Sequence, residues 1–266
     1  MWYKFLDTSQ LYSVAVSRYG WLKAMGVYHE DIIFVETNED IKLYDRQNPL
    51  SPISPGAITI DTFEPILDEI DGIFYRCVYD RLYNIGSGDV IIDAGARIGT
   101  FSVKASQIVG DQGLVVAIEP EPYNYSLLIQ NITHNNIKNV VPIQKMVWSE
   151  RKYVTLNLSI FSASHSAYSD DYYNNNGRSI DVSADTLDNI LFDIGIDKVS
   201  FIKMDIEGAE IEALKGMEEI MQRGTTLAIA AYHPVNGLLS KDIIIPEIKK
   251  VQYMVSSNED IVFAYK

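Results

Sequence analysis

From residue 89 onward, short apolar runs alternate with stretches whose apolar residues recur at helical spacing. The apolar runs predict strands buried on both faces, because such strands lack a polar alternation. Repeated strand–helix units predict an α/β fold with a mostly parallel, doubly wound sheet. The predicted strands are Val90–Asp93, Leu114–Ile118, Val140–Val147, Tyr153–Leu158, Val199–Met204 and Leu227–Tyr232, and the predicted helices are Thr100–Val109, Tyr123–His134, Ala184–Phe192 and Ala209–Met221.

Hairpin patterns lie near both ends of the chain. Ile32–Val35 and Ile41–Tyr44 are β-like runs on either side of a polar turn, and Val251–Val255 and Ile261–Tyr265 repeat this arrangement near the C-terminus. Asn, Asp and Ser between two apolar runs are typical of hairpin turns. The terminal hairpin would add an antiparallel strand to the sheet. Residues 1–25 are predicted to be helical.

A proline-rich stretch separates the first hairpin from the rest of the chain. Asn48–Gly56 contains three prolines and a glycine, a composition that favours a linker. A connecting region with a helix over Ile73–Tyr83 is predicted to follow. We therefore expect a small N-terminal α+β region over residues 1–70, acting as a substrate cover or an interface, and an α/β domain over residues 71–266.

One polar segment interrupts the alternation. Residues 161–178 are rich in Tyr, Ser and Asn and have no period. A loop of this length inside a compact domain is usually functional or disordered. We expect it to contact substrate through His165, Tyr168, Tyr172 or Tyr173.

The clearest chemical signal follows the strand predicted at Val90–Asp93. Asp93 closes this strand, Gly95 and Gly99 follow at G-x-x-x-G spacing, and a helical pattern begins at Thr100. Such a turn brings backbone N–H groups and a carboxylate to the sheet edge where open α/β folds bind nucleotide-like ligands. The G-x-G-x-x-G of a dinucleotide site is absent. The turn therefore favours a cationic or neutral nucleoside over a pyrophosphate.

Further polar residues end the other predicted strands. Glu119 closes the next strand and precedes Pro120, so it is placed to accept hydrogen bonds from ribose hydroxyls. Asp205 and Glu207 lie where a later strand becomes a helix. Acids in that position also cap helices, and Glu210 fits capping better than catalysis.

His233 ends the strand predicted at Leu227–Tyr232. Its imidazole is a suitable general base, because the ordinary pKa of histidine is near neutrality, although a polar strand end before a proline turn is an equal explanation. Near the end of the third strand, the apolar side chains of Met146 and Trp148 could pack on a flat base or fill the core. Hard metal ligands are available, but no spacing demands a metal, and none is predicted.

Composition narrows the partners. A net charge of −14 argues against a nucleic acid and against an anionic membrane surface. Cys77 is the single cysteine, which excludes an internal disulfide and favours a reducing compartment. No apolar run approaches the roughly 20 residues of a spanning helix, and the first residues do not resemble a signal peptide. A cytoplasmic location is expected.

Three motifs resemble those of the FkbM family of methyltransferases. They are Ile92–Gly99, Ala117–Pro122 and Ile202–Gly216, and the Asp-Ile-Glu-Gly-Ala-Glu string in the third is close to the hallmark of the family. The resemblance extends over residues 85–235. It implies a Rossmann-like methyltransferase fold that uses S-adenosylmethionine. It also implies O-methylation of a hydroxyl on a sugar, glycan or polyketide-like small molecule.

The resemblance also implies roles for individual residues. Asp93, Gly95 and Gly99 would line the methionine and ribose side of the cofactor, whereas Pro120 and Tyr123 would lie near the adenine. The family usually has Asn at the position of Arg97, so we expect Arg97 to turn outward or to pair with an acid. The expected cofactor contacts are Asp93, Gly95, Arg97, Gly99, Thr100, Glu119, Pro120, Tyr123, Met146 and Asp205, and the expected catalytic residues are Asp205, Glu207 and His233.

Two other functions remain open at this stage. One is an NAD-dependent oxidoreductase or epimerase, which the missing dinucleotide turn disfavours. The other is a non-catalytic nucleoside-binding module, which has no need of the acids at the strand ends, and fold alone does not prove activity. The acceptor molecule and the oligomeric state, a homo-oligomer included, are left open.

Overall fold

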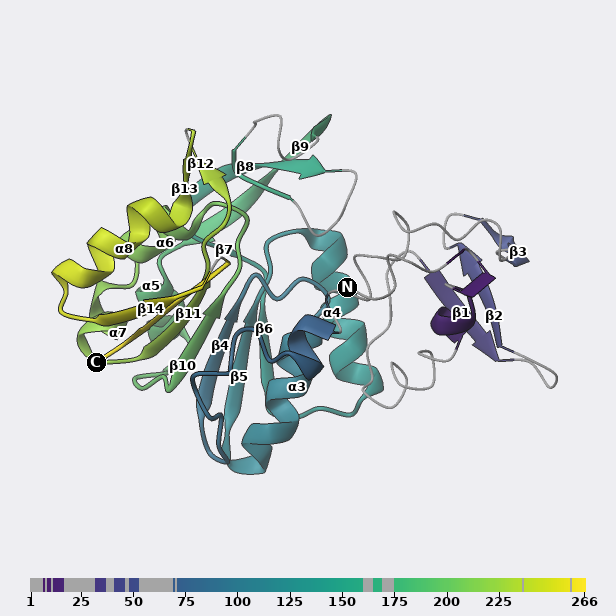
Figure 1. Ribbon diagram of the computed structural model, residues 1–266, viewed down its shortest axis with the longest axis horizontal. Coiled ribbons are helices and arrows are strands. Elements are labelled where there is room, and N and C mark those ends of the chain that lie inside the picture. The colour runs from purple at the N-terminus through teal and green to yellow at the C-terminus, as the bar shows by residue number, and fades with distance from the viewer. Residues whose placement is uncertain are drawn as a thin grey trace.

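The computed structural model describes residues 7, 9–10, 12–16, 32–36, 41–45, 48–52, 69, 71–159, 165–168, 175–235, 237–258 and 260–266 (Figure 1). The centre of the fold is a seven-stranded sheet with the order β14-β15-β11-β10-β4-β5-β6. Its strands are β4 (Val90–Ala94), β5 (Leu114–Ile118), β6 (Val140–Ile143), β10 (Phe201–Met204), β11 (Thr226–Ala230), β14 (Met254–Ser257) and β15 (Ile261–Tyr265).

Within the seven-stranded sheet, β6, β5, β4, β10 and β11 run parallel, and the terminal hairpin of β14 and β15 is antiparallel to them. β15 pairs antiparallel with both β11 and β14, whereas β10, β4, β5 and β6 pair in parallel. The predicted doubly wound sheet with its terminal antiparallel hairpin is therefore confirmed, and the topology is Rossmann-like.

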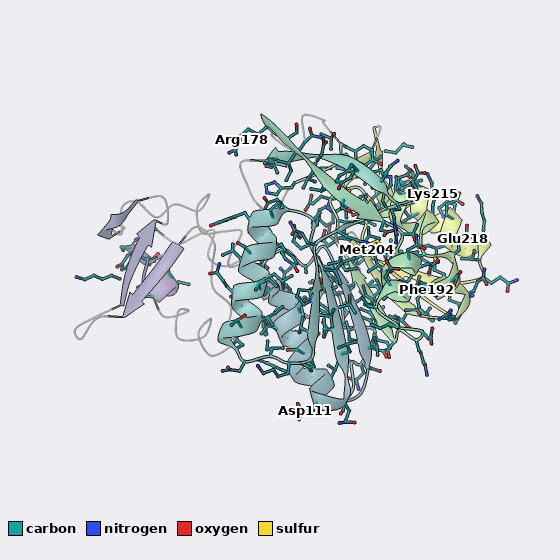
Figure 2. All side chains as sticks on the ribbon, turned by 180° about the vertical axis from the view of Figure 1, so that it is seen from behind. Asp111, Arg178, Phe192, Met204, Lys215 and Glu218 are labelled. Carbon is teal, nitrogen blue, oxygen red and sulfur yellow. The ribbon has the colours of Figure 1, made fainter. Side chains whose placement is uncertain are left out.

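Helices cover both faces of this sheet. α3 (Thr100–Val109) and α4 (Pro122–His134) pack on the face that includes Ile91 and Val115. α5 (Leu187–Asp193), α6 (Glu210–Lys215), α7 (Glu218–Gln222) and α8 (Ser240–Lys250) cover the face that includes Ile92 and Val116. Neighbouring residues of one strand thus enter opposite cores, which explains why the strands are apolar throughout. Figure 2 shows Met204 deep inside the domain and Phe192 at its periphery.

A second sheet lies beyond the carboxyl end of the main sheet. It contains β7 (Met146–Val147), β8 (Lys152–Ser159) and β9 (Asn175–Asp185) in the order β7-β9-β8. The strand predicted over Val140–Val147 is therefore wrong as one element, because it divides between two sheets. β9 was not predicted, and the following helix begins later than expected, at Leu187.

Three other predicted elements differ from the structure. The helix predicted over Ile73–Tyr83 is wrong: a short π-helix, η3 (Asp71–Tyr75), is followed by turns. The helix predicted over Ala209–Met221 is broken into α6 and α7 at Gly216, where a Cβ would lie 2.1 Å from the backbone oxygen of Trp148. α8 was not predicted, and it contains Pro246, a residue that disfavours the interior of a helix. Short pieces complete the domain: η4 (Gly110–Gln112), β12 (Pro234–Val235) and β13 (Leu238–Leu239).

The N-terminal hairpin is confirmed by β1 (Ile32–Glu36) and β2 (Ile41–Asp45), which pair antiparallel. β3 (Asn48–Pro52) adds a third strand to them, so the first part of the predicted linker is wrong. An edge strand tolerates proline because one side of its backbone needs no partner. The remainder of that linker, and Tyr172 and Tyr173, lie outside the described residues. Residues 9–10 and 12–16 are helical, and the domain boundary at residue 70 stays a prediction.

Among the described helices, none is both long and apolar enough to cross a membrane.

Candidate functional site

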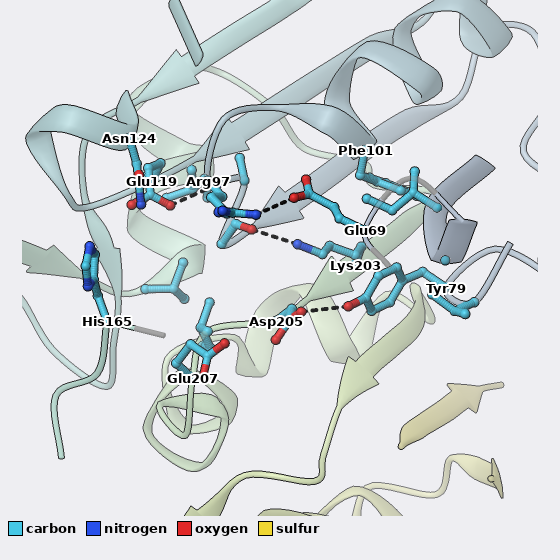
Figure 3. Close-up of a pocket in the computed structure, with 18 of the residues that line it drawn as sticks. Glu69, Tyr79, Arg97, Phe101, Glu119, Asn124, His165, Lys203, Asp205 and Glu207 are labelled. Carbon is cyan, nitrogen blue, oxygen red and sulfur yellow. Dashed lines mark hydrogen bonds and ion pairs between the residues drawn. The ribbon is translucent and has the colours of Figure 1, made fainter. Parts of the chain in front are cut away.

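The carboxyl ends of β4, β5 and β10 open into a cavity of about 540 Å³ (Figure 3). A residue that lines this cavity follows each strand directly: Gly95 after β4, Glu119 after β5 and Asp205 after β10. The expected meeting of these strand ends at one edge of the sheet is confirmed. Of the other predicted site residues, the wall also includes Arg97, Pro120, Met146 and Glu207.

Gly95 brings the turn after β4 against the end of β10. Its φ is 75°, which glycine adopts without strain, and a Cβ would lie 1.8 Å from the backbone oxygen of Asp205. The N–H groups of Gly95 and the next residue both donate to the carbonyl of Ile118, and that of Arg97 donates to Oε2 of Glu119 at 2.9 Å. These N–H groups therefore tie β4 to β5 and do not point toward a ligand, contrary to expectation. The turn shapes the cavity.

Asp93 lies behind this wall and is fully buried. Its Oδ2 accepts a hydrogen bond from Oγ of Ser102 at 2.6 Å, and its Oδ1 lies 3.0 Å from Nζ of Lys203. Lys203 faces Asp93 in the register of β4 and β10 and also donates to the carbonyl of Gly95 at 2.7 Å. The charge of Asp93 is thus balanced by a lysine and not by a bound ligand.

Lys203 was missed as a site residue. It lines the cavity although it belongs to a buried strand. Burial disfavours its charge, but the carboxylates of Asp93 and Asp205 outweigh this effect and raise the pKa of Lys203. A lysine inside an otherwise apolar strand is the signal that could have identified it.

Glu119 is a buried carboxyl group on the cavity wall, with 6% of its surface exposed. It accepts hydrogen bonds from the N–H groups of Arg97 and Glu121, each at 2.9 Å. Burial raises the pKa of Glu119 to about 7, although these hydrogen bonds act in the opposite direction. Pro120 and Asn124 lie beside it on the wall, so a carboxylate with remaining acceptor capacity faces a partly apolar space.

Four expected cofactor contacts lie away from the described cavity wall. Asp93 is held by Lys203. Gly99 starts α3 and packs against Leu128, where a Cβ would lie 2.5 Å from Cδ1. Thr100 is buried and donates to Glu69. Tyr123 is 45% exposed on the outer side of α4. Three of these residues support the turn, and Tyr123 faces solvent.

Arg97 forms an ion pair with Glu69, as Figure 3 shows. Its φ of 52° lies in the left-handed region, and both side chains border the cavity. The expectation that Arg97 pairs with an acid is confirmed. Glu69, which sequence analysis missed, lies 28 residues before Arg97 in the chain and gives no local signal of this contact.

Four residues at the ends of β10 and β11 form what we call the acid–histidine cluster: Asp205, Glu207, Glu210 and His233. Nδ1 of His233 lies 3.0 Å from Oε1 of Glu210. Nε2 lies 3.4 Å from Oε2 of Glu207 and 3.6 Å from Oδ1 of Asp205. Tyr79 donates to the other oxygen of Asp205 at 2.6 Å. The three expected catalytic residues are therefore brought together, with Asp205 and Glu207 on the cavity wall and His233 behind them.

The cluster shifts the protonation of its members. Burial raises the pKa of Glu207 to about 8, partly offset by His233. Burial lowers the pKa of His233, but Glu210, Glu207 and Asp205 outweigh it and raise this pKa to about 10. At neutral pH His233 therefore carries a proton and neutralises its neighbours, which argues against its expected role as the base.

The segment after β8 reaches the cavity. His165 lines the wall, and its Nδ1 accepts a hydrogen bond from the N–H of Ser159 at 3.0 Å. Ser166 donates to the backbone oxygen of Glu207 at 2.6 Å. The part of the predicted substrate loop that the structure describes is thus anchored beside the acid–histidine cluster.

The fold and cavity define a class of protein. A Rossmann-like sheet with a cavity at the carboxyl ends of its strands and a buried carboxylate at the end of β5 is typical of nucleoside-binding α/β proteins. Comparison with known proteins then gives the family. The chain belongs to the methyltransferase FkbM domain family, whose model matches residues 93–259.

Individual relatives agree with this assignment. Methyltransferase sdnD of Sordaria araneosa is 27% identical over 175 residues, covering 55% of this chain and 67% of the relative. The 31-O-demethyl-FK506 methyltransferase FkbM of Streptomyces tacrolimicus is 23% identical over 217 residues, covering 71% and 82%. The crystal structure of methyltransferase FkbM from Methylobacillus flagellatus KT matches with a TM-score of 0.51 and 20% identity. That match covers 74% of this chain and 47% of the other, so this chain spans about half the length of that structure and shares its fold.

Proposed function

We propose that this chain is an S-adenosylmethionine-dependent methyltransferase that methylates a hydroxyl group on a sugar, glycan or polyketide-like small molecule. The observation that carries the proposal is the placement of Glu119. It is a buried carboxylate at the end of β5, opposite Asp205 and Glu207 across one cavity. Family membership supports methyl transfer and disfavours the oxidoreductase alternative.

The residues of the cavity fit this cofactor. Glu119 has the position and the acceptor oxygens to bind ribose hydroxyls. The adjacent Pro120, Asn124 and Met146 offer a partly apolar surface for a base. Asp205 and Glu207 place carboxyl groups on the same wall, and a cationic sulfonium beside them would favour their charged forms. The cofactor supplies an already activated methyl group when bound.

The protein then has to position the acceptor and remove its proton. Glu207 lies on the cavity wall, and its pKa of about 8 is near the value that suits a general base. Asp205, fixed by Tyr79, orients the acceptor hydroxyl, and His233 holds the carboxylates in place from behind. In-line alignment of the hydroxyl oxygen with the methyl group provides the remaining acceleration.

Two segments outside the main sheet contribute to the acceptor side in this proposal. Glu69 enters the cavity from the N-terminal region, and His165 enters from the loop after β8. We propose that residues 1–70 form a separate region that helps cover the acceptor.

Calorimetric titration with S-adenosylhomocysteine tests the cofactor. We expect micromolar binding by the native chain, loss of binding in Glu119→Ala, and no binding of NAD. Hydroxylated sugars and polyketides would then be screened for methyl transfer. Binding of NAD instead would contradict the proposal, and cofactor binding without transfer to any hydroxylated acceptor would favour a nucleoside-binding module.

A further inference from the structure

The acid–histidine cluster gathers three carboxyl groups around a single imidazole. Asp205, Glu207 and Glu210 each have a carboxylate oxygen within 3.6 Å of His233. Glu210 and His233 are fully buried. Buried carboxylates repel one another and lose their hydration, so they are retained only with compensating partners. The neighbouring Lys203 is already engaged by Asp93 and a backbone carbonyl.

Three buried atoms in this part of the described structure have no hydrogen-bond partner. They are Oδ1 of Asp205, Oε2 of Glu210 and Nε2 of His233. The second polar atom of each side chain is engaged: Tyr79 donates to Oδ2 of Asp205, and Oε1 of Glu210 meets Nδ1 of His233. Unpartnered buried polar atoms are costly, and three of them on one cluster point to a missing cation. Such a cation would accept lone pairs from the two carboxylates and, once it has displaced a proton, from the imidazole.

We infer that Asp205, Glu210 and His233 bind a divalent transition-metal ion of the Mn²⁺ type at the inner wall of the cavity. One donor atom from each residue lies within 4.8 Å of the donors of the other two. Two carboxylates and one imidazole form a mixed oxygen–nitrogen set, which suits Mn²⁺, Fe²⁺ or Zn²⁺ better than Ca²⁺. A small inward movement of these side chains would reach bonding distance.

Glu210 is held firmly for this purpose. Its Oε1 accepts from the backbone N–H groups of Ile206 and Gly208, each at 3.2 Å, as well as facing Nδ1 of His233. A carboxylate that fixes one ring nitrogen of a histidine directs the other nitrogen toward a metal. Glu210 and Asp205 therefore both approach the imidazole, and one donor atom from each of the three residues faces the same small volume, which helix capping alone does not require.

The site lies beside the proposed acceptor position. Asp205 lines the cavity, whereas Glu210 and His233 lie behind it, so an ion between them would border the cavity. There it would attract the acceptor oxygen and stabilise the negative charge that develops as Glu207 removes the proton. This role rests on the proposed methyl transfer, but binding of the ion does not.

Titration of the chelator-treated full-length chain with Mn²⁺, followed by electron paramagnetic resonance, tests the site. We expect a single class of bound Mn²⁺, displaced by Zn²⁺. Asp205→Asn and Glu210→Gln should each weaken binding by about tenfold or more. Glu212→Gln is the matched control, because it also removes a carboxylate from α6. Glu212 pairs with Ser149 and Lys215, outside the proposed site, so this variant should bind Mn²⁺ as tightly as the native chain does.

Binding of S-adenosylhomocysteine is also measured on every variant. This measurement shows whether each variant is folded, and it distinguishes failure of the metal site from failure of the proposed function. A native chain that binds the nucleoside but not Mn²⁺ overturns the metal site and leaves the proposed function intact. Mn²⁺ binding that Asp205→Asn and Glu210→Gln do not weaken also overturns the site. If the native chain binds Mn²⁺ but not the nucleoside, and the two variants lose Mn²⁺ binding, the metal site is supported and the proposed cofactor is contradicted.

Discussion

At the scale of the single residue, the burial of Glu119 and its proposed role in binding ribose favour different protonation states. Burial favours its neutral form, with a pKa of about 7, whereas ribose hydroxyls are best accepted by the charged form. The fold therefore holds this carboxyl near its midpoint at neutral pH. Cofactor binding and folding stability should depend on pH in opposite senses.

Cofactor affinity should rise as pH increases through about 7. Deprotonation of Glu119 creates the stronger hydrogen-bond acceptor, so titration of the native chain with S-adenosylhomocysteine between pH 6 and pH 8 should show progressively tighter binding. Glu119→Gln should bind weakly, with little pH dependence over this range. A native affinity that does not change across this range would contradict the assigned role.

Stability should change in the opposite direction. The unfolded carboxyl titrates near 4.5 and the folded one near 7, so between these values the native state retains a proton that the unfolded state loses. The stabilisation is present below pH 4.5 and is lost as pH rises through 7, by at most about 3 kcal/mol. Denaturant unfolding of the native chain and Glu119→Gln at several pH values measures it, and parallel curves would contradict the burial argument.

Gly95 is required by close contact as well as by conformation. Gly95→Ala should destabilise the fold by about 2–4 kcal/mol, because its Cβ would meet the backbone of Asp205 at 1.8 Å in addition to the strain of a positive φ. Gly88→Ala is the matched control, with φ of 86° and no atom near its Cβ, and should cost about 1 kcal/mol. Urea unfolding distinguishes them, and equal losses would show that conformation alone explains the glycine.

At the scale of the elements, the alternation of apolar runs predicted the central sheet well. β4, β5, β10 and β11 appear where expected, because strands buried on both faces carry a signal in each residue. The terminal hairpin also appears where expected, and its signal is the polar turn between two β-like runs. Where a tertiary contact decides an element, the sequence pattern was insufficient. Gly216 ends α6 because it approaches Trp148, and β9 pairs through an Asn-rich stretch that resembles a loop.

The site was predictable where its residues end strands. Glu119, Asp205 and Glu207 follow predicted strands and do line the cavity. The contacts of Lys203 and Glu69 join segments far apart in the chain, so no local pattern indicates them. Asp93 has the correct position in the motif but points into the core, because its partner Lys203 lies on the adjacent strand.

The pair of Asp93 and Lys203 joins β4 to β10 beneath the cavity. Lys203→Met should destabilise the chain by about 3–5 kcal/mol, because it leaves a buried carboxylate without a counter-charge. The double variant Asp93→Asn/Lys203→Met should lose less than the two single variants together. Lys152→Met, which removes an exposed ion pair with Glu150, should cost less than about 1 kcal/mol. Additive losses in denaturant unfolding would show that the pair does not act as a unit.

At the scale of the whole molecule, a residue far from the turn in the chain contributes charge to the cavity. Arg97 brings a cation to a site proposed for a cationic cofactor, and Glu69, 28 residues earlier in the chain, pairs with it. The ion pair makes the two segments electrostatically dependent on each other. Glu69 therefore explains how the chain tolerates Arg97 in this turn.

Removal of the Glu69 charge should weaken binding of the cofactor more than binding of its product. S-adenosylmethionine carries a sulfonium charge that S-adenosylhomocysteine lacks, so Glu69→Gln should weaken binding of the first by about fivefold while changing the second little. Calorimetry with both ligands measures the difference. Adding Arg97→Gln to the Glu69→Gln variant should restore the native ratio of the two affinities, because the unbalanced cation is then gone. Equal losses for both ligands, or no rescue, would show that Glu69 acts through the shape of the cavity and not through its charge.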